Sequence, residues 1–168
     1  MGRKTITVSL SVPELVYDIQ NKAYLTGEAR RSEGAKAYEA ASNMQASDDE
    51  DNIYQIKRTL STAFSSLKSV FGEFLTDSSA DGSTDNALYD EVENDGTLVL
   101  TFSMPSNYNQ AAADSLGKEV HAYLVDMALG DWFSITNRED AQIYTSRVEQ
   151  HIGVLKRALY RRSRPVKA

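Results

Sequence analysis

The residues best suited to acid–base chemistry in this chain are two histidines, His121 and His151. A histidine acts as a general base only when its ring is oriented beside a nucleophile or a carboxylate. Glu119 and Glu149 each lie two residues from a histidine, a spacing that points the paired side chains toward different faces of a helix. We therefore expect both histidines to be structural residues that are exposed or half-buried.

Other catalytic and metal-binding patterns are weak or missing. Residues 77–82 (DSSADG) match the opening of a calcium-binding loop, but its twelfth position, which should be a bidentate Glu, is Leu88. The sequence contains no cysteine, no glycine-rich phosphate loop and no nucleophile elbow. We therefore expect no metal, no cofactor and no catalytic residue, and we interpret the chain as a non-enzymatic protein.

The strongest functional signal is the charge at the C-terminus. The net charge is −6, yet residues 156–168 carry six basic side chains and no acid, while residues 77–95 carry seven acids and no base. Such asymmetry is typical of an interaction segment, and arginine pairs well with carboxylates and phosphates. The predicted partner-binding residues belong to a basic tail at 161–168, and they are Arg161, Arg162, Arg164 and Lys167.

Three interpretations of the basic tail remain open. Phosphate contacts would make it a nucleic-acid arm, and carboxylate contacts would make it a peg that docks in an acidic partner. A tail with neither kind of contact would be a frayed terminus. The acidic balance of the whole chain favours a protein partner over DNA, because dedicated nucleic-acid-binding proteins usually present a broad basic face.

These residues need a scaffold, and the sequence indicates one that repeats itself. Residues 5–13 (TITVSLSVP) are echoed by residues 97–105 (TLVLTFSMP), and both runs alternate polar and apolar residues before a proline. The alternation predicts β-strands at 4–10 and 97–103. A helical pattern follows each strand.

Apolar residues at helical spacing, with capping boxes before three of the runs, predict four helices. Gly27 and Gly130 are expected to end the first and third helices. Residues 28–46 are polar, and they are either a helix that orders against a partner or a connection. The four helices are expected at about 12–25, 49–75, 107–129 and 137–160.

A small group of aromatic residues is the remaining candidate for a binding surface. Its members are Tyr108, Trp132, Phe133 and Tyr144. Aromatic residues that follow a helix-ending glycine more often fill the space between helices, so we favour a core role. Trp132 is the predicted core anchor of the second half.

Together these patterns predict a mainly helical α+β fold, a four-helix core with a two-stranded β ribbon. We expect one domain over 1–168, built from β-α-α pseudo-repeat halves at about 4–76 and 96–162, with an acidic loop at 77–95. The two strands are expected to pair and to lie on the helices. No apolar run is long enough to span a bilayer, so no membrane contact is expected.

Several segments resemble small proteins encoded among the virion genes of tailed phages and of prophages of gut bacteria. Together they cover most of the chain outside the acidic loop. The similar stretches are residues 12–22 (VPELVYDIQNK), 43–49 (NMQASDD), 103–110 (SMPSNYNQ) and 130–137 (GDWFSITN).

The resemblance implies a structural virion protein, and the size and helical content are similar to those of head–tail connector (adaptor) subunits, which form rings beneath the portal. The implied partners are identical subunits in a ring and the portal or another neck or tail protein, whose carboxylates would meet the arginines of the tail. The implied location is the virion, after assembly in the host cytoplasm. The two strands depart from an all-helical adaptor, which leaves a neck or tail-completion protein open. The alternative function is a nucleic-acid-binding accessory protein that uses the basic tail.

Overall fold

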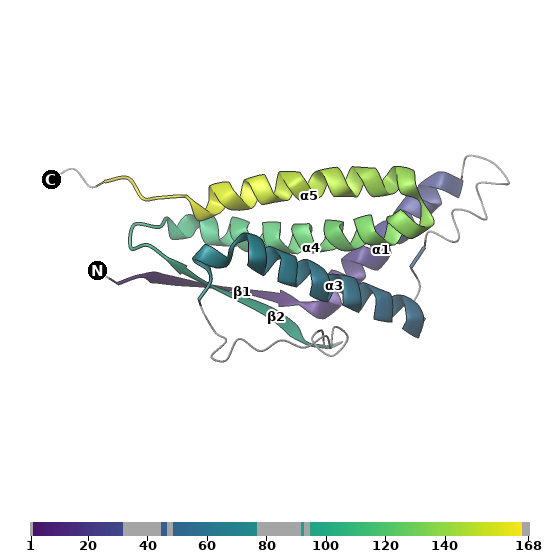
Figure 1. The fold of residues 1–168 in the computed structure, drawn as a ribbon, viewed down its shortest axis with the longest axis horizontal. Helices are drawn as coiled ribbons and strands as arrows, with labels where there is room; N and C mark the ends of the chain where they lie inside the picture. The colour runs from purple at the N-terminus through teal and green to yellow at the C-terminus, as the bar shows by residue number, and fades with distance from the viewer. Residues whose placement is uncertain (1, 32–44, 47–48, 77–91, 93–94, 166–168) are drawn as a thin grey trace.

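The computed structural model describes residues 2–31, 45–46, 49–76, 92 and 95–165. This part of the chain is mainly helical and contains a two-stranded sheet, which confirms the predicted mainly helical α+β class (Figure 1). The calcium-like loop and residues 32–44 lie outside the described residues. In chain order, the elements are β1 (Lys4–Ser11), α1 (Val12–Arg31), α3 (Glu50–Val70), the 3-10 turn η1 (Gly72–Phe74), β2 (Thr97–Met104), the 3-10 turn η2 (Gln110–Ala112), α4 (Ala113–Thr136) and α5 (Arg138–Leu159).

The two strands pair with each other in antiparallel fashion. Lys4 lies opposite Met104 and Ser11 lies opposite Thr97, so both predicted strands are confirmed, each with one further residue at its C-terminal end. One face of the ribbon is buried and apolar, while the other carries mainly Ser and Thr. The alternation in the sequence therefore corresponds to the two faces of one ribbon.

The first helix is longer than predicted. It continues through Thr26 and Gly27 to Arg31, so the expected stop at this glycine is wrong. The Thr26 hydroxyl donates a hydrogen bond to the Lys22 carbonyl and lies 3.1 Å from the Tyr144 hydroxyl of α5, and Gly27 is buried. The helix therefore continues through a buried glycine in spite of its weak helix propensity, and α5 contacts it at the neighbouring Thr26.

The third predicted helix also passes through its expected stop. Gly130 lies inside α4, and residues 132–135, predicted as a link, are helical. Gly130 is buried where α4 meets α5, and a Cβ atom built on it would lie 3.3 Å from the Thr145 hydroxyl oxygen. This glycine allows two helices to approach closely instead of ending one of them.

The turn between α4 and α5 is a single residue, Asn137, which caps the N-terminus of α5. The Asn137 side-chain oxygen accepts hydrogen bonds from the backbone N–H groups of Glu139 and Asp140, at 3.1 and 3.5 Å. The helix is therefore capped at its N-terminus, but by Asn137 and not by Thr136, so the predicted capping box of residues 136–139 is wrong. At α3, which begins at Glu50, Asp49 makes no side-chain capping bond, and Ser47 and Asp48 of the predicted box lie outside the described residues.

The other helix boundaries differ from the predictions by a few residues. The second predicted helix ends at Val70, and Gly72–Phe74 forms the 3-10 turn η1. The third begins at Ala113, after the 3-10 turn η2. The fourth ends at Leu159, close to its expected end.

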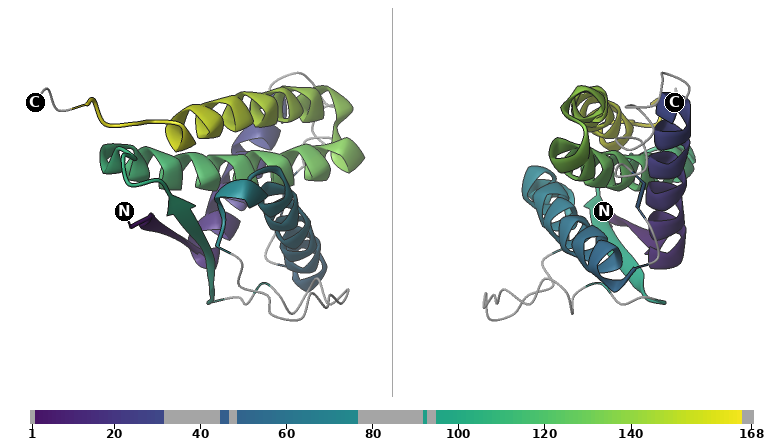
Figure 2. Two further views of the ribbon diagram at one scale, coloured as in Figure 1. Left: turned by 60° about the vertical axis from the view of Figure 1, so that its left-hand side comes forward. Right: turned by 90° about the vertical axis from the view of Figure 1, so that its right-hand side faces the viewer.

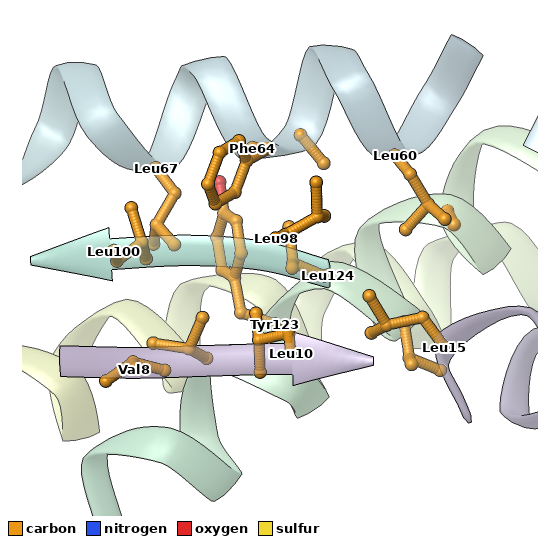
Figure 3. Packing of buried hydrophobic residues seen from close by; sticks show 14 of the residues in the cluster. Val8, Leu10, Leu15, Leu60, Phe64, Leu67, Leu98, Leu100, Tyr123 and Leu124 are labelled. Atoms are coloured by element: carbon orange, nitrogen blue, oxygen red, sulfur yellow. The ribbon is translucent and has the colours of Figure 1, made fainter. Parts of the chain in front are cut away.

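The core lies between the ribbon and α4. Figure 2 shows α4 above the sheet, with α1 and α3 on its two sides and α5 packed on its far face. Figure 3 shows side chains from both strands meeting residues of α1, α3 and α4, such as Leu15, Phe64 and Leu124. In the part of the chain that the structure describes, buried residues from all of these elements form one cluster.

The aromatic residues divide differently from the prediction. Phe133 is fully buried and stacks on Tyr144 with ring centroids 5.4 Å apart, and Tyr108 is also fully buried. Trp132 is only partly buried at the edge of the core. The core role of this aromatic group is confirmed, but Phe133 replaces Trp132 as the anchor.

The contact at Gly130 gives a test of the fold. Gly130→Leu should lower the free energy of unfolding by about 1–3 kcal/mol, because the new side chain has to displace α5. Gly153→Leu is the matched control, since Gly153 lies on the exposed side of α5 with open space around it. Urea denaturation measures both. Equal effects of the two substitutions would contradict the close helix approach.

Candidate functional site

The candidate partner-binding site lies at the end of the molecule where both termini emerge (Figure 1). Arg3 and Lys4 stand at the beginning of β1, and the basic tail follows α5 at the same end. Because β1 and β2 are antiparallel, the beginning of β1 lies beside the end of β2 and the connection to α4. The sequence predicts a basic tail alone, and the structure adds the two basic residues of the N-terminus to it.

The first part of the tail is held against the body. The Ser163 N–H donates to the Asn107 carbonyl at 2.7 Å, and the Asn109 N–H donates to the Arg161 carbonyl at 3.3 Å. Tyr108 and Arg162 form the β-bridge between these two segments. Residues 161–163 are therefore paired like a short strand and are not frayed.

The predicted tail residues have different environments. Arg161 and Arg164 are exposed, and no ion pair with a described residue engages either of them. Arg162 is half-buried, and its guanidinium donates to the Leu159 and Arg161 carbonyls at 2.9 and 3.0 Å. Arg162 thus caps the end of α5, a common role for a basic residue near a helix C-terminus. Lys167 lies outside the described residues.

A hollow at this end presents two guanidinium groups. It measures about 450 Å³, and its lining includes Arg157 and Arg161 of α5 and its extension, with Ser115 and Asn109 opposite them. None of the described residues that line it carries a carboxylate. Such a surface binds carboxylate or phosphate groups through charge-assisted hydrogen bonds. Glu73 also lies near this end, where it accepts a hydrogen bond from the Tyr160 hydroxyl at 3.3 Å.

The second candidate is a histidine held between two carboxylates. His151 of α5 bonds through Nε2 to the Asp126 carboxylate at 2.6 Å and through Nδ1 to the Glu119 carboxylate, both on α4. Glu119 and Asp126 are seven residues apart, so they lie on the same face of α4, two turns from each other. The expectation that His151 is half-buried is confirmed. Its carboxylate partners come from α4 and not from Glu149, its neighbour in sequence.

Sequence spacing hid this cluster because its members belong to different helices. The pair Glu119 and Asp126 was visible as a heptad spacing, but nothing in the sequence showed that α5 would bring His151 between them. His121 shows the same pattern: it bonds at 2.5 Å to Asp18, which lies on α1. Each histidine therefore pairs across helices and not along its own.

The geometry of His151 favours a structural role over a catalytic one. Partial burial alone would lower its pKa, but the hydrogen bonds and charges of Asp126 and Glu119 outweigh that effect and raise the pKa of His151 above its ordinary value. With both nitrogens bonded to carboxylates, the protonated ring donates twice and keeps no free lone pair to accept a proton from a substrate.

Asp126 also lines a cavity between α3, α4 and α5. The cavity measures about 500 Å³ and is bordered mainly by hydroxyl, amide and charged side chains, among them Thr59, Arg58 and Asp131. Thr59 donates to the Asp131 carboxylate at 2.7 Å. The Asp126 side chain is almost fully buried, and its second oxygen has Lys22 at 3.9 Å but no hydrogen-bond partner among the described residues.

Comparisons of the chain with family models, with curated proteins and with solved structures find no match. Among the described residues, no group of three or more side chains is arranged to hold a metal ion. Of the helices that the structure describes, none combines the length and the apolar character needed to cross a membrane.

The His151 cluster predicts a pH-dependent stability. Because its folded-state pKa is raised, the stabilisation is fully present below the unfolded-state pKa of about 6.5 and is lost as the pH rises through the folded-state pKa. His151→Gln should lower the free energy of unfolding by about 3 kcal/mol at pH 6, since it leaves buried carboxylate charge without its cation. The loss should shrink at pH 9.

Urea denaturation at the two pH values measures this effect. His121→Gln is the matched control, because that histidine pairs with one carboxylate at a more exposed site. A loss of stability in His151→Gln that is the same at both pH values would contradict a charged histidine at this position.

Proposed function

We propose that the chain is a non-enzymatic structural subunit of a tailed-phage virion, a head–tail connector or neck protein that assembles as a ring beneath the portal. The observation that carries the proposal is the basic end of the molecule, where both termini converge and where Arg3, Lys4, Arg157 and the tail from Arg161 lie. Arg157 and Arg161 are exposed there and suit an acidic protein surface, such as a ring of portal carboxylates. The resemblance of residues 103–110 and 130–137 to virion-cluster proteins supports the same role.

The anchored tail supports a docking peg over a loose terminus. Backbone pairing of residues 161–163 with residues 107–109 fixes the direction in which the chain leaves the body. A segment with a fixed exit loses less conformational entropy when it binds than a free terminus does. The arginines on it are therefore presented at a constant place on the subunit.

The polar clusters support a non-enzymatic role. His151 has no free ring nitrogen, because its bonds to Glu119 and Asp126 hold α5 against α4. A cation on one helix between two carboxylates on the next is the arrangement expected of an ion-pair cluster that fixes two helices to each other. The proposal therefore assigns His151, Glu119 and Asp126 to stability and the basic end to function.

The alternative is a nucleic-acid-binding accessory protein. The basic end favours it because Arg3, Lys4 and Arg157 add positive charge near the tail. Salt dependence distinguishes the two functions. DNA binding releases counterions and therefore weakens steeply as the salt concentration rises.

A charge reversal at the basic end separates the two functions. Arg157→Glu with Arg161→Glu, at the hollow, should reduce binding to the portal protein of the same phage at least tenfold, because like charges then face each other. Arg138→Glu with Arg147→Glu makes the same change in net charge on exposed positions of α5 and should have little effect. Surface plasmon resonance with immobilised portal protein measures both.

The same variants with duplex DNA complete the test. The connector proposal predicts no stable DNA binding by the unmodified chain at physiological salt. Salt-sensitive DNA binding that the same charge reversal abolishes, together with unchanged portal binding, would favour the alternative and contradict the connector.

A further inference from the structure

One edge of the ribbon is open. In an antiparallel pair, alternate residues bond across to the partner strand, and the residues between them direct their N–H and C=O groups to the other side. The Val12 N–H donates to the Gly96 carbonyl at 3.1 Å in the same register as the ladder, so the even-numbered residues of β1 bond to β2. Thr5, Thr7 and Ser9 therefore present their backbone groups at the outer edge.

The two outer edges of the ribbon differ. The edge of β2 is partly covered, because the Thr76 N–H donates to the Thr101 carbonyl at 2.9 Å and Leu75 bridges to Phe102. At the edge of β1, no backbone hydrogen bond from a described residue reaches Thr7 or Ser9. An unpaired edge of this kind is a template for another strand.

A groove lies along the open edge. It measures about 660 Å³, and its walls are residues 7–11 of β1 and residues 113–121 of α4, with Glu14 of α1. Gly117 lies in the α4 wall, where a Cβ atom would stand 4.0 Å from a Val8 methyl group. The groove thus combines unpaired backbone groups on one side with a helix surface on the other, as an extended peptide requires.

We propose that this groove binds residues 164–168 of a second copy of the chain, which add to β1 as a strand. The inference deepens the ring proposed above, and it rests on that proposal for the closure of successive contacts into a ring. Contacts in which the tail of each subunit enters the groove of the next are head-to-tail, and such contacts generate rings when their rotation closes.

The direction of the tail supports binding between copies. Residues 161–163 are fixed to the body, and Arg164 and Pro165 then run away from it at the end where β1 begins (Figures 1 and 2). A chain that leaves in this direction would have to reverse to reach residues 7–11 of its own β1, whereas a neighbour's groove needs no reversal.

Charge and chemistry support the same occupant. The charged residues that line the groove are Glu14, Asp114 and Lys118, with His121 beside them, and Arg164 is a basic residue of the tail. Asp114 already pairs with Lys118 at 3.2 Å, but both side chains are highly exposed, so an incoming guanidinium can share the carboxylate at little cost. Pro165 lacks an N–H group, which an added edge strand tolerates.

A peptide experiment tests the inference directly. The probe is the synthetic peptide of residues 163–168 (SRPVKA), and the protein is the chain ending at Ser163, which keeps the anchored part of the tail. Saturating peptide should slow amide hydrogen exchange at Thr7 and Ser9 at least tenfold, because their outward N–H groups become bonded. Exchange at Val8, which already bonds to β2, should change little.

Two variants and one control locate the binding. Ser9→Pro removes an outward N–H without removing a bond to β2, and Gly117→Arg fills the groove with a long basic side chain. Each should weaken peptide binding at least tenfold in a fluorescence polarisation titration. Gly153→Arg is the matched control, since Gly153 lies in open space on α5, and it should leave binding unchanged. Gly117→Arg keeps the test decisive if Ser9→Pro fails to fold.

The outcomes separate this inference from the proposed function. Unchanged exchange at Thr7 and Ser9, or peptide binding that survives both variants, would overturn the groove. A dimer of the truncated chain that protects the same amides without peptide would show that β1 pairs with β1 instead, which also overturns it. Portal binding by the full chain with no peptide binding would remove only this inference, and peptide binding without portal binding would remove only the connector.

Discussion

The antiparallel pairing of β1 with β2 is the contact on which the rest of the molecule depends. It joins two halves of the chain that are separated by about ninety residues in sequence, and it presents one apolar face to the helices. Two strands alone are marginal in water, so the ribbon relies on the core beneath α4. The same pairing places the N-terminus beside the basic tail and leaves the edge of β1 open. The position of the core, of the basic end and of the groove therefore all depend on the register in which β1 pairs with β2.

The second constraint is the close packing of α4 on α5. Gly130 lets the two helices approach each other closely, and Asn137 is the single residue that joins them and caps α5. Between them, His151 balances the charge of two carboxylates, one of which is almost fully buried. Polar residues that resemble parts of an active site are thereby used to fix the position of α5. The start of the tail is fixed in the same way, because it continues directly from α5.

Much of this fold could be predicted because its signals are local. The alternation in residues 5–13 and 97–105 gave both strands, and helical spacing gave the helices to within a few residues at most ends. The failure at Gly130 has a physical cause, since a buried glycine that lets two helices approach looks in sequence like a glycine that ends a helix. Gly27 is likewise buried inside a helix, α1.

The candidate sites were predictable only in part. The basic tail is contiguous in sequence and was therefore visible. The structure adds that the Arg162 guanidinium caps the end of α5 through hydrogen bonds to two backbone carbonyls. The His151 cluster and the groove beside β1 unite residues from different elements. Their members become neighbours only through the packing of α4, which no spacing along the chain reveals.

Quantitative mass spectrometry of virions purified from cells that produce the chain tests the proposed function most directly. A connector or neck subunit is a permanent part of the particle. The account predicts that the chain is present in a constant ratio to the portal protein, with several copies per particle, and that it remains after washing at high salt and nuclease treatment. Its absence from purified virions, or its loss on nuclease treatment, would contradict the account.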